Sequence, residues 1–189
     1  MNRYGLTLHA TLAAILLGCA QAAAAADGLY LGVGLGAATV KDNFEGSTFE
    51  AEDLAYRGIL GWRFNQIPLV DLAVEAAYTN FGKPSQIVAP SSGAPAQNVE
   101  YKLHGPSLAG LVILPLGPVD LYAKGGVLDW KLDRTTGATT TSRSGSDAFY
   151  GVGAGFYLWK LAFRAEYQRF QIKDVDRVEM FTLDALFQF

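Results

Sequence analysis

The residues of this sequence best suited to chemistry are a histidine and a serine in the run Leu103-His-Gly-Pro-Ser107. A histidine that takes the proton of a serine hydroxyl activates that serine for attack on an acyl ester. Residues three apart on a strand point to opposite faces, so His104 and Ser107 form no such pair unless a bulge at Pro106 changes the geometry. The sequence shows no zinc-type ligand cluster and no nucleophile elbow. We therefore predict a protein that is not an enzyme and that has no cofactor or metal.

A second run alternates glycine with apolar residues, in Leu29-Tyr-Leu-Gly-Val-Gly-Leu-Gly36. A glycine-rich loop that cradles a phosphate opens a helix, and no helical pattern follows this run. Gly32, Gly34 and Gly36 instead share one face of a strand, where they would leave room for long side chains.

Charged residues recur at alternate positions in several segments, which places them on one face of each strand. In a closed barrel they would point into the interior. Arg164 would lie directly across from Asp184 if the last hairpin is symmetric about Asp174. Eight strands leave a lumen that side chains can fill, so we expect a plugged interior. The predicted interior charges are Arg57, Glu75, Lys102, Lys124, Arg164, Glu166 and Asp184.

Eight segments alternate apolar and polar residues with the period of two that strands require. An outer-membrane barrel turns its apolar face to the lipid, whereas a soluble barrel turns it inward. With the apolar faces outward, Lys102 and His104 of the fourth segment are expected inside, and Pro106 indicates a bulge or a register change there. The segments are 29–38, 54–64, 70–81, 99–114, 119–131, 148–158, 161–170 and 181–189.

The connections between these segments alternate in length. Residues 65–68, 115–118 and 159–160 form tight turns, whereas 39–53, 82–98 and 133–147 are long and polar. Short turns on one side and long loops on the other are typical of outer-membrane barrels. We expect the long segments to be loops that contact lipopolysaccharide, host surfaces or phage.

Both ends of the sequence carry features of an exported membrane protein. Residues 1–26 have a basic start, an apolar stretch and an alanine-rich exit, which is the pattern of a secretory signal peptide. The run Leu16-Leu17-Gly18-Cys19 also resembles a lipoprotein cleavage site, and cleavage there would make Cys19 a lipidated N-terminus. The barrel domain is expected to span 27–189. The final strand has an apolar residue at every second position: Phe181, Leu183, Ala185, Phe187 and Phe189.

Composition narrows the class further. The chain has 15 Lys and Arg against 18 Asp and Glu, so it lacks the basic surface that a nucleic-acid partner requires. Its 21 Gly, 11 Phe and 9 Tyr suit a lipid-facing sheet with aromatic girdles. A soluble β-sandwich could share this composition, and the alternation together with the two chain ends favours the membrane barrel.

On these residues the chain resembles the transmembrane domain of OmpA-like proteins and its small relatives of the OmpX, Ail and opacity type. The glycine-rich strands at 29–36 and Tyr150-Gly-Val-Gly-Ala-Gly-Phe-Tyr157 are typical of that family. The terminal strand resembles the signal that the barrel assembly machinery recognises.

The resemblance implies an all-β protein, an eight-stranded antiparallel up-and-down transmembrane β-barrel in the bacterial outer membrane, in contact with outer-membrane lipid and lipopolysaccharide. It also implies a structural or envelope-integrity role, or a surface-interaction, adhesin-like one. A narrow ion or solute channel and a lipid A-modifying enzyme are the alternatives.

Overall fold

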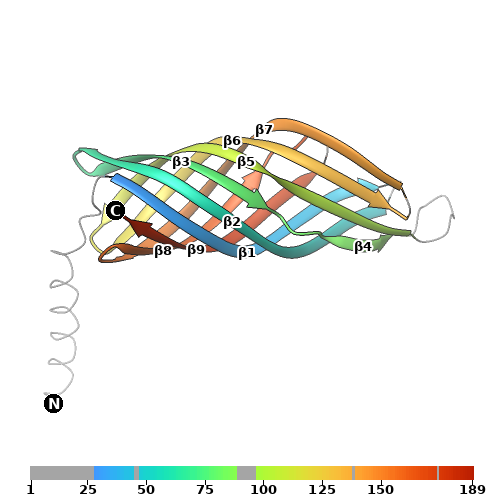
Figure 1. The fold of residues 1–189 in the computed structure, drawn as a ribbon, viewed down its shortest axis with the longest axis horizontal. Helices are drawn as coiled ribbons and strands as arrows, with labels where there is room; N and C mark the ends of the chain where they lie inside the picture. Colours follow the sequence, from blue (N-terminus) through green and yellow to red (C-terminus); the bar gives the residue numbers. More distant parts are fainter. Residues whose placement is uncertain (1–27, 45–46, 89–96, 138, 174) are drawn as a thin grey trace, which may run out of the picture.

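The computed structural model describes residues 28–44, 47–88, 97–137, 139–173 and 175–189, which wrap into a closed antiparallel barrel (Figure 1). The signal-peptide prediction therefore lies outside the described residues. No helix within these ranges is long and apolar enough to cross a membrane. The strands are β1 (Gly28–Phe44), β2 (Ser47–Ile67), β3 (Val70–Asn80), β4 (Ser85–Val88), β5 (Gln97–Leu116), β6 (Val119–Thr136), β7 (Thr139–Leu158), β8 (Leu161–Phe170) and β9 (Arg177–Gln188).

The barrel has eight strand positions because β3 and β4 lie one after the other along β5. β3 pairs with both β2 and β5, and β4 continues along β5 with its register shifted by one residue. β9 closes the barrel against β1, with Asp184 opposite Gly34. Each predicted segment overlaps one of the eight positions, so the predicted all-β, up-and-down, eight-stranded barrel is confirmed.

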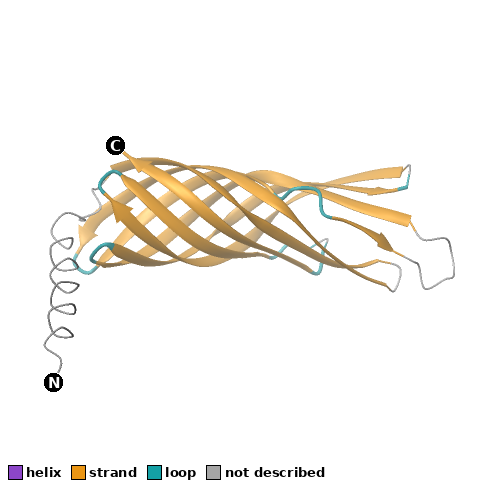
Figure 2. Cartoon of the chain, turned by 90° about the horizontal axis from the view of Figure 1, so that it is seen from below, coloured by secondary structure: helices purple, strands orange, loops and turns teal. Residues whose placement is uncertain are grey.

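Two-residue turns join the strands at one end of the barrel, where β1 also begins and β9 ends (Figure 2). One residue of each turn has the positive φ that a tight hairpin connection requires, namely Leu69, Gly117 and Trp159. The strands reach much further at the opposite end. We call the two ends the turn end and the far end.

The predicted long loops at 39–53 and 133–147 are wrong, because most of these residues are paired strand. The ladder between β1 and β2 continues to Phe44 opposite Ser47, and the ladder between β6 and β7 continues to Thr136 opposite Thr139. The expected strands end where the outward face stops being apolar. In the structure the outward faces of these residues are polar, but the backbone pairing continues. Of the third predicted loop, 82–98, the described part includes β4.

The two faces of the barrel wall exchange polarity partway along the strands. In the half nearer the turn end, large apolar side chains are exposed outward and charged ones are buried inside. Toward the far end the apolar side chains are inside, and the outward positions carry Lys, Glu, Asp, Ser and Thr. Four outward tyrosines stand near the level of this exchange: Tyr56, Tyr78, Tyr150 and Tyr167.

Strand β5 was assigned the wrong orientation by the sequence pattern. Tyr101 and Leu103 are about 1% exposed and point inward, whereas Leu108 is 59% exposed and points outward. The apolar residues 101 and 103 belong to the far half, where the interior is apolar, so they do not mark a lipid-facing side. Lys102 therefore lies on the outward face and is not an interior charge, and His104 lies on the same outward face.

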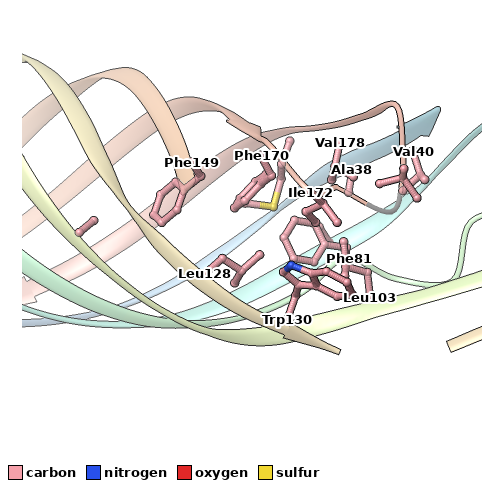
Figure 3. Close-up of a cluster of buried hydrophobic side chains, with 14 of the residues drawn as sticks. Ala38, Val40, Phe81, Leu103, Leu128, Trp130, Phe149, Phe170, Ile172 and Val178 are labelled. Atoms are coloured by element: carbon pink, nitrogen blue, oxygen red, sulfur yellow. The ribbon is translucent and has the colours of Figure 1, made fainter. Parts of the chain in front are cut away.

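The interior of the far half is a hydrophobic core, drawn in Figure 3. Phe170 is its central ring: it packs edge-on against Phe81 at 4.9 Å between centroids and stacks on Phe149 at 5.2 Å. Trp130 Nε1 donates to Asp147 Oδ2 at 2.9 Å, which satisfies the one polar atom of the indole. We call this cluster the far-half core.

Gly36 makes the closing seam between β1 and β9 possible. A Cβ atom at Gly36 would lie 1.8 Å from the carbonyl oxygen of Phe181 and 2.7 Å from Cα of Thr182. We expect Gly36→Ala to destabilise the barrel by about 1–3 kcal/mol, because the clash is with backbone that no rotamer change can move. The matched control is Gly58→Ala, since a Cβ at Gly58 has no neighbour within 4 Å. Urea titration of both variants in detergent checks the prediction, and equal midpoints would contradict it.

Candidate functional site

Six charged side chains meet inside the turn-end half of the barrel and form the interior charge cluster. Each is at most 5% exposed. The cluster holds three cations and three carboxylates, so its charges cancel. Its members are Arg57, Glu75, Lys124, Arg164, Glu166 and Asp184.

Arg57 on β2 reaches across β1 to two carboxylates. Its Nε and Nη2 donate to the two oxygens of Asp184 at 3.0 and 2.6 Å, and its Nη1 donates to Oε1 of Glu166 at 2.9 Å. Gly34 stands between Arg57 and Asp184 in the sheet, and a Cβ there would lie 2.1 Å from Asp184 Oδ1. This inward glycine thus makes room for long charged side chains, as the alternation of glycines in β1 predicts.

Arg164 lies directly opposite Asp184 in the register of β8 and β9, as predicted. Its shortest ion pair is nevertheless formed elsewhere: Nη2 donates to Oε2 of Glu75 at 2.9 Å, whereas Nε is 3.8 Å from Asp184 Oδ2. The guanidinium also faces the rings of Tyr30 and Tyr122, with its Cζ 5.8 and 5.3 Å from their centroids. Arg164 is therefore held mainly by groups from across the lumen.

Lys124 joins the two glutamates of the cluster. Its Nζ donates to Glu75 Oε1 at 2.5 Å and to Glu166 Oε1 at 3.0 Å. Tyr30 donates to Glu75 Oε2 at 3.1 Å and Tyr122 to Glu166 Oε2 at 2.7 Å. The two carboxylates therefore accept hydrogen bonds on both of their oxygens, which offsets the desolvation of their charge.

A second buried ion cluster lies closer to the turn end and was absent from the predicted set. Arg63 donates to Asp71 Oδ2 through Nε at 2.8 Å, and its Nη1 donates to Asp120 Oδ2 at 2.6 Å and to the hydroxyl of Tyr157 at 2.7 Å. The sequence alternation does indicate these positions. Arg63, Asp71 and Asp120 each lie an even number of residues from a predicted interior charge on the same strand, and therefore on the same face. The alternation that selects Arg57 also selects Arg63.

The far-half core is closed toward the far end by a polar contact between strands. The hydroxyl of Tyr101 on β5 donates to Oδ2 of Asp42 on β1 at 2.6 Å. Burial raises the pKa of Tyr101 above its ordinary value, and the hydrogen bond to Asp42 acts in the same direction. The tyrosine therefore remains protonated, and able to donate, to a higher pH than an exposed tyrosine.

Taken from the turn end outward, the interior consists of the Arg63 cluster, the interior charge cluster and the far-half core. All three layers are made of buried side chains that contact one another across the lumen. Such an arrangement stabilises the barrel and fills its centre.

His104 and Ser107 point to opposite faces of β5, as their spacing predicts, and do not form a pair. Ser107 is on the inward side of β5 and its hydroxyl donates to the carbonyl of Ala77 at 3.4 Å, whereas His104 points outward. The predicted bulge at Pro106 is also wrong: His104 is opposite Lys131 and Ser107 is opposite Leu128, which is one continuous register. Within the described ranges, no group of three or more His, Cys, Asp and Glu side chains could hold a metal ion.

The five residues of the predicted assembly signal are all exposed, four of them on the outward face of β9 and Phe189 directly after it. Phe187 and Phe189 pack edge to face at 5.1 Å between ring centroids near the turn end. Recognition of this strand by the assembly machinery stays a prediction. The residues are Phe181, Leu183, Ala185, Phe187 and Phe189.

Comparison with known proteins agrees with this geometry. The family model described as "Outer membrane protein beta-barrel domain" matches residues 10–189. No curated protein sequence matches the chain.

Several solved barrels are similar to the structure, all at low sequence identity. Neisserial surface protein A shares 15% identity at a TM-score of 0.62, covering 85% of this chain and 97% of its own. Ail, the attachment invasion locus protein of Yersinia pestis, shares 18% at 0.55, covering 87% and 100%. The N-terminal barrel domain of Pseudomonas aeruginosa OprF shares 14% at 0.52, covering 86% and 98%.

Proposed function

Because the chain belongs to the outer membrane protein β-barrel family and is an outer-membrane protein, we propose that it is a closed, non-catalytic barrel with a structural and surface-interaction role. The short turns would face the periplasm and the long strands would stand outside the cell, as in other barrels of this class. The observation that carries the proposal is the filled interior. It leaves the surface of the far half as the part available for function.

The layered interior supports a barrel that does not conduct. An ion would have to cross the interior charge cluster, whose members are at most 5% exposed, and then the far-half core. A layer of buried apolar side chains is a high barrier to an ion, since a charge is costly to desolvate.

The far-end hairpins support a surface role. β6 and β7 remain paired up to Thr136 and Thr139, and residues 139 to 144 are all exposed, with the hydroxyl side chains Thr140, Ser142 and Ser144 on the outward face. A paired hairpin presents such groups with less loss of conformational entropy on binding than a loop of the same length. Neisserial surface protein A and the Yersinia attachment protein have the same fold, which makes attachment the role to test.

The test shortens one hairpin and leaves the barrel below it intact. Deletion of residues 134–141 and insertion of Asn-Gly would join Asp133 to Ser142, which already face each other in the ladder, through a favoured two-residue turn. We expect cells that produce the full protein to attach to epithelial cells several-fold better than cells that produce the shortened protein. We also expect neither purified protein to give steady conductance in planar bilayers.

A heat-dependent shift in gel mobility serves as the folding control for both proteins. Equal attachment by the two, or attachment no better than that of cells lacking the protein, would contradict the surface role. Steady single-channel conductance by the full protein would instead establish the narrow channel.

A further inference from the structure

A pocket of about 580 Å³ opens on the outer face of the barrel wall, where the polarity of the strands changes. It spans β3, β5, β6 and β7. The outward apolar side chains of the turn-end half form an apolar belt around the barrel, and Tyr78 lies at the edge of the pocket next to this belt. Two apolar outward residues of that belt, Leu108 and Val127, are opposite each other on β5 and β6 close to the pocket. The outward polar side chains that line it are His104, Asp129, Lys131, Ser144 and Ser146.

The pocket lies where the ladder between β5 and β6 is interrupted. The pairing of β5 with β6 lapses at Gly105 and Pro106, where the proline has no N–H to donate. Gly105 and Gly145 lie beside Trp130 on the neighbouring strands, and a Cβ at Gly145 would come within 2.7 Å of the indole. The inward-facing residues Gly105, Trp130 and Gly145 therefore line the pocket between its outward side chains.

The polar groups of the pocket form two rows across the strands. His104, Lys131 and Ser144 are opposite one another on β5, β6 and β7, and Asp129 is opposite Ser146 in the row nearer the turn end. Nδ1 of His104 is buried and has no hydrogen-bond partner among the described residues. A buried nitrogen of this kind is satisfied when a ligand or water supplies the missing partner.

We propose that this pocket binds the headgroup of a phosphorylated glycolipid in the outer leaflet. Lys131 and His104 supply donors for a phosphate, and Asp129 with the two serines supplies acceptors and hydroxyls for a sugar. The acyl chains of the same lipid then lie on the apolar belt beside Leu108 and Val127. The proposal depends on the outer-membrane location and not on the attachment role of the hairpins.

The lining favours a sugar phosphate over a simple anionic phospholipid. Asp129 and Lys131 cancel in charge, so the pocket offers no net attraction to an anion as such. Its selectivity comes from several hydrogen-bonding groups placed together, which a headgroup with a single phosphate leaves unpaired. Tyr78 and Pro106 at the edge offer apolar surfaces for the faces of a sugar ring.

The test measures lipid retained by the purified full-length protein in detergent micelles, by native mass spectrometry. The protein is titrated with lipid A, with phosphatidylglycerol and with phosphatidylcholine. The variant is the double substitution His104→Ala with Lys131→Ala. The matched control is Lys41→Ala, which removes an outward lysine on β1 that pairs with Glu50 at 2.6 Å.

We expect a one-to-one adduct with lipid A for the wild-type protein and for Lys41→Ala. The double variant should form at least five-fold less of it at the same lipid concentration while still showing the heat-dependent gel shift of a folded barrel. Equal retention of phosphatidylglycerol and lipid A by the wild-type protein would overturn the proposal, as would a double variant that retains lipid A fully.

Discussion

Replacement of Glu166 by glutamine should lower the free energy of unfolding by about 3–5 kcal/mol, the range found when one partner of a buried ion pair is removed. Glu166 accepts hydrogen bonds from Arg57, Lys124 and Tyr122 and is 1% exposed. Glutamine keeps the shape of the side chain but not its charge. The cluster would then hold three cations and two carboxylates in a space that water does not reach.

A second substitution separates the charge effect from any change in packing. Lys124→Met removes one cation and keeps a long unbranched side chain, so Glu166→Gln with Lys124→Met restores the balance of charge. We expect the double variant to recover most of the stability in urea titrations followed by tryptophan fluorescence. The exposed Glu52→Gln serves as the control and should be neutral. A double variant less stable than Glu166→Gln alone would show that the balance of charge is not what holds the cluster.

Truncation of Phe170 to alanine should cost about 3–5 kcal/mol, because it removes the ring on which the far-half core is built. Phe170 is 4% exposed and contacts Phe81 and Phe149 directly. The strands around it are closed by backbone hydrogen bonds on both sides, so they cannot move inward to fill the cavity.

The matched control is Phe163→Ala on the same strand. Phe163 points outward into the lipid and is 51% exposed. Its removal should lower the free energy of unfolding only by the contribution from transferring the ring out of water, about 1.5–3 kcal/mol. No cavity is added to this cost, because lipid chains fill the space that the ring leaves. Both values come from unfolding titrations in the same detergent. Equal losses for the two variants would mean that the far half has no packed interior.

The strands and their number could be predicted because a period of two is a local property of the chain. In β2, for example, Trp62 and Phe64 alternate with Arg63, and the structure places the first two outward and Arg63 inside. The orientation of β5 could not be predicted in this way. Its inward face is apolar along most of its length, including Leu111 and Ile113. Its outward face is apolar only where Leu108, Val112 and Leu114 meet the lipid, so the apolar pattern does not tell the two faces apart.

The interior charges, too, could be predicted only in part from the sequence. The structure places six of the seven predicted residues inside, and Lys102 is outside because it lies beyond the level of the switch. The register opposite a neighbouring strand could be predicted, as for Arg164 and Asp184. The contact between Arg164 and Glu75 could not, because β8 and β3 are not neighbours and meet only once the barrel has closed.

The exchange of polarity along the wall also fixes how the protein responds to bilayer thickness. A transmembrane segment with apolar residues to spare meets a thicker bilayer by drawing more of its length into the hydrocarbon. This barrel has little to spare above its tyrosines: Leu54 is exposed beyond Tyr56 on β2, but the outward positions on the other side of the barrel include Asp129 on β6 and Ser146 on β7. Any hydrophobic mismatch therefore falls on the surrounding lipid, which must thin or thicken around a barrel of constant apolar height.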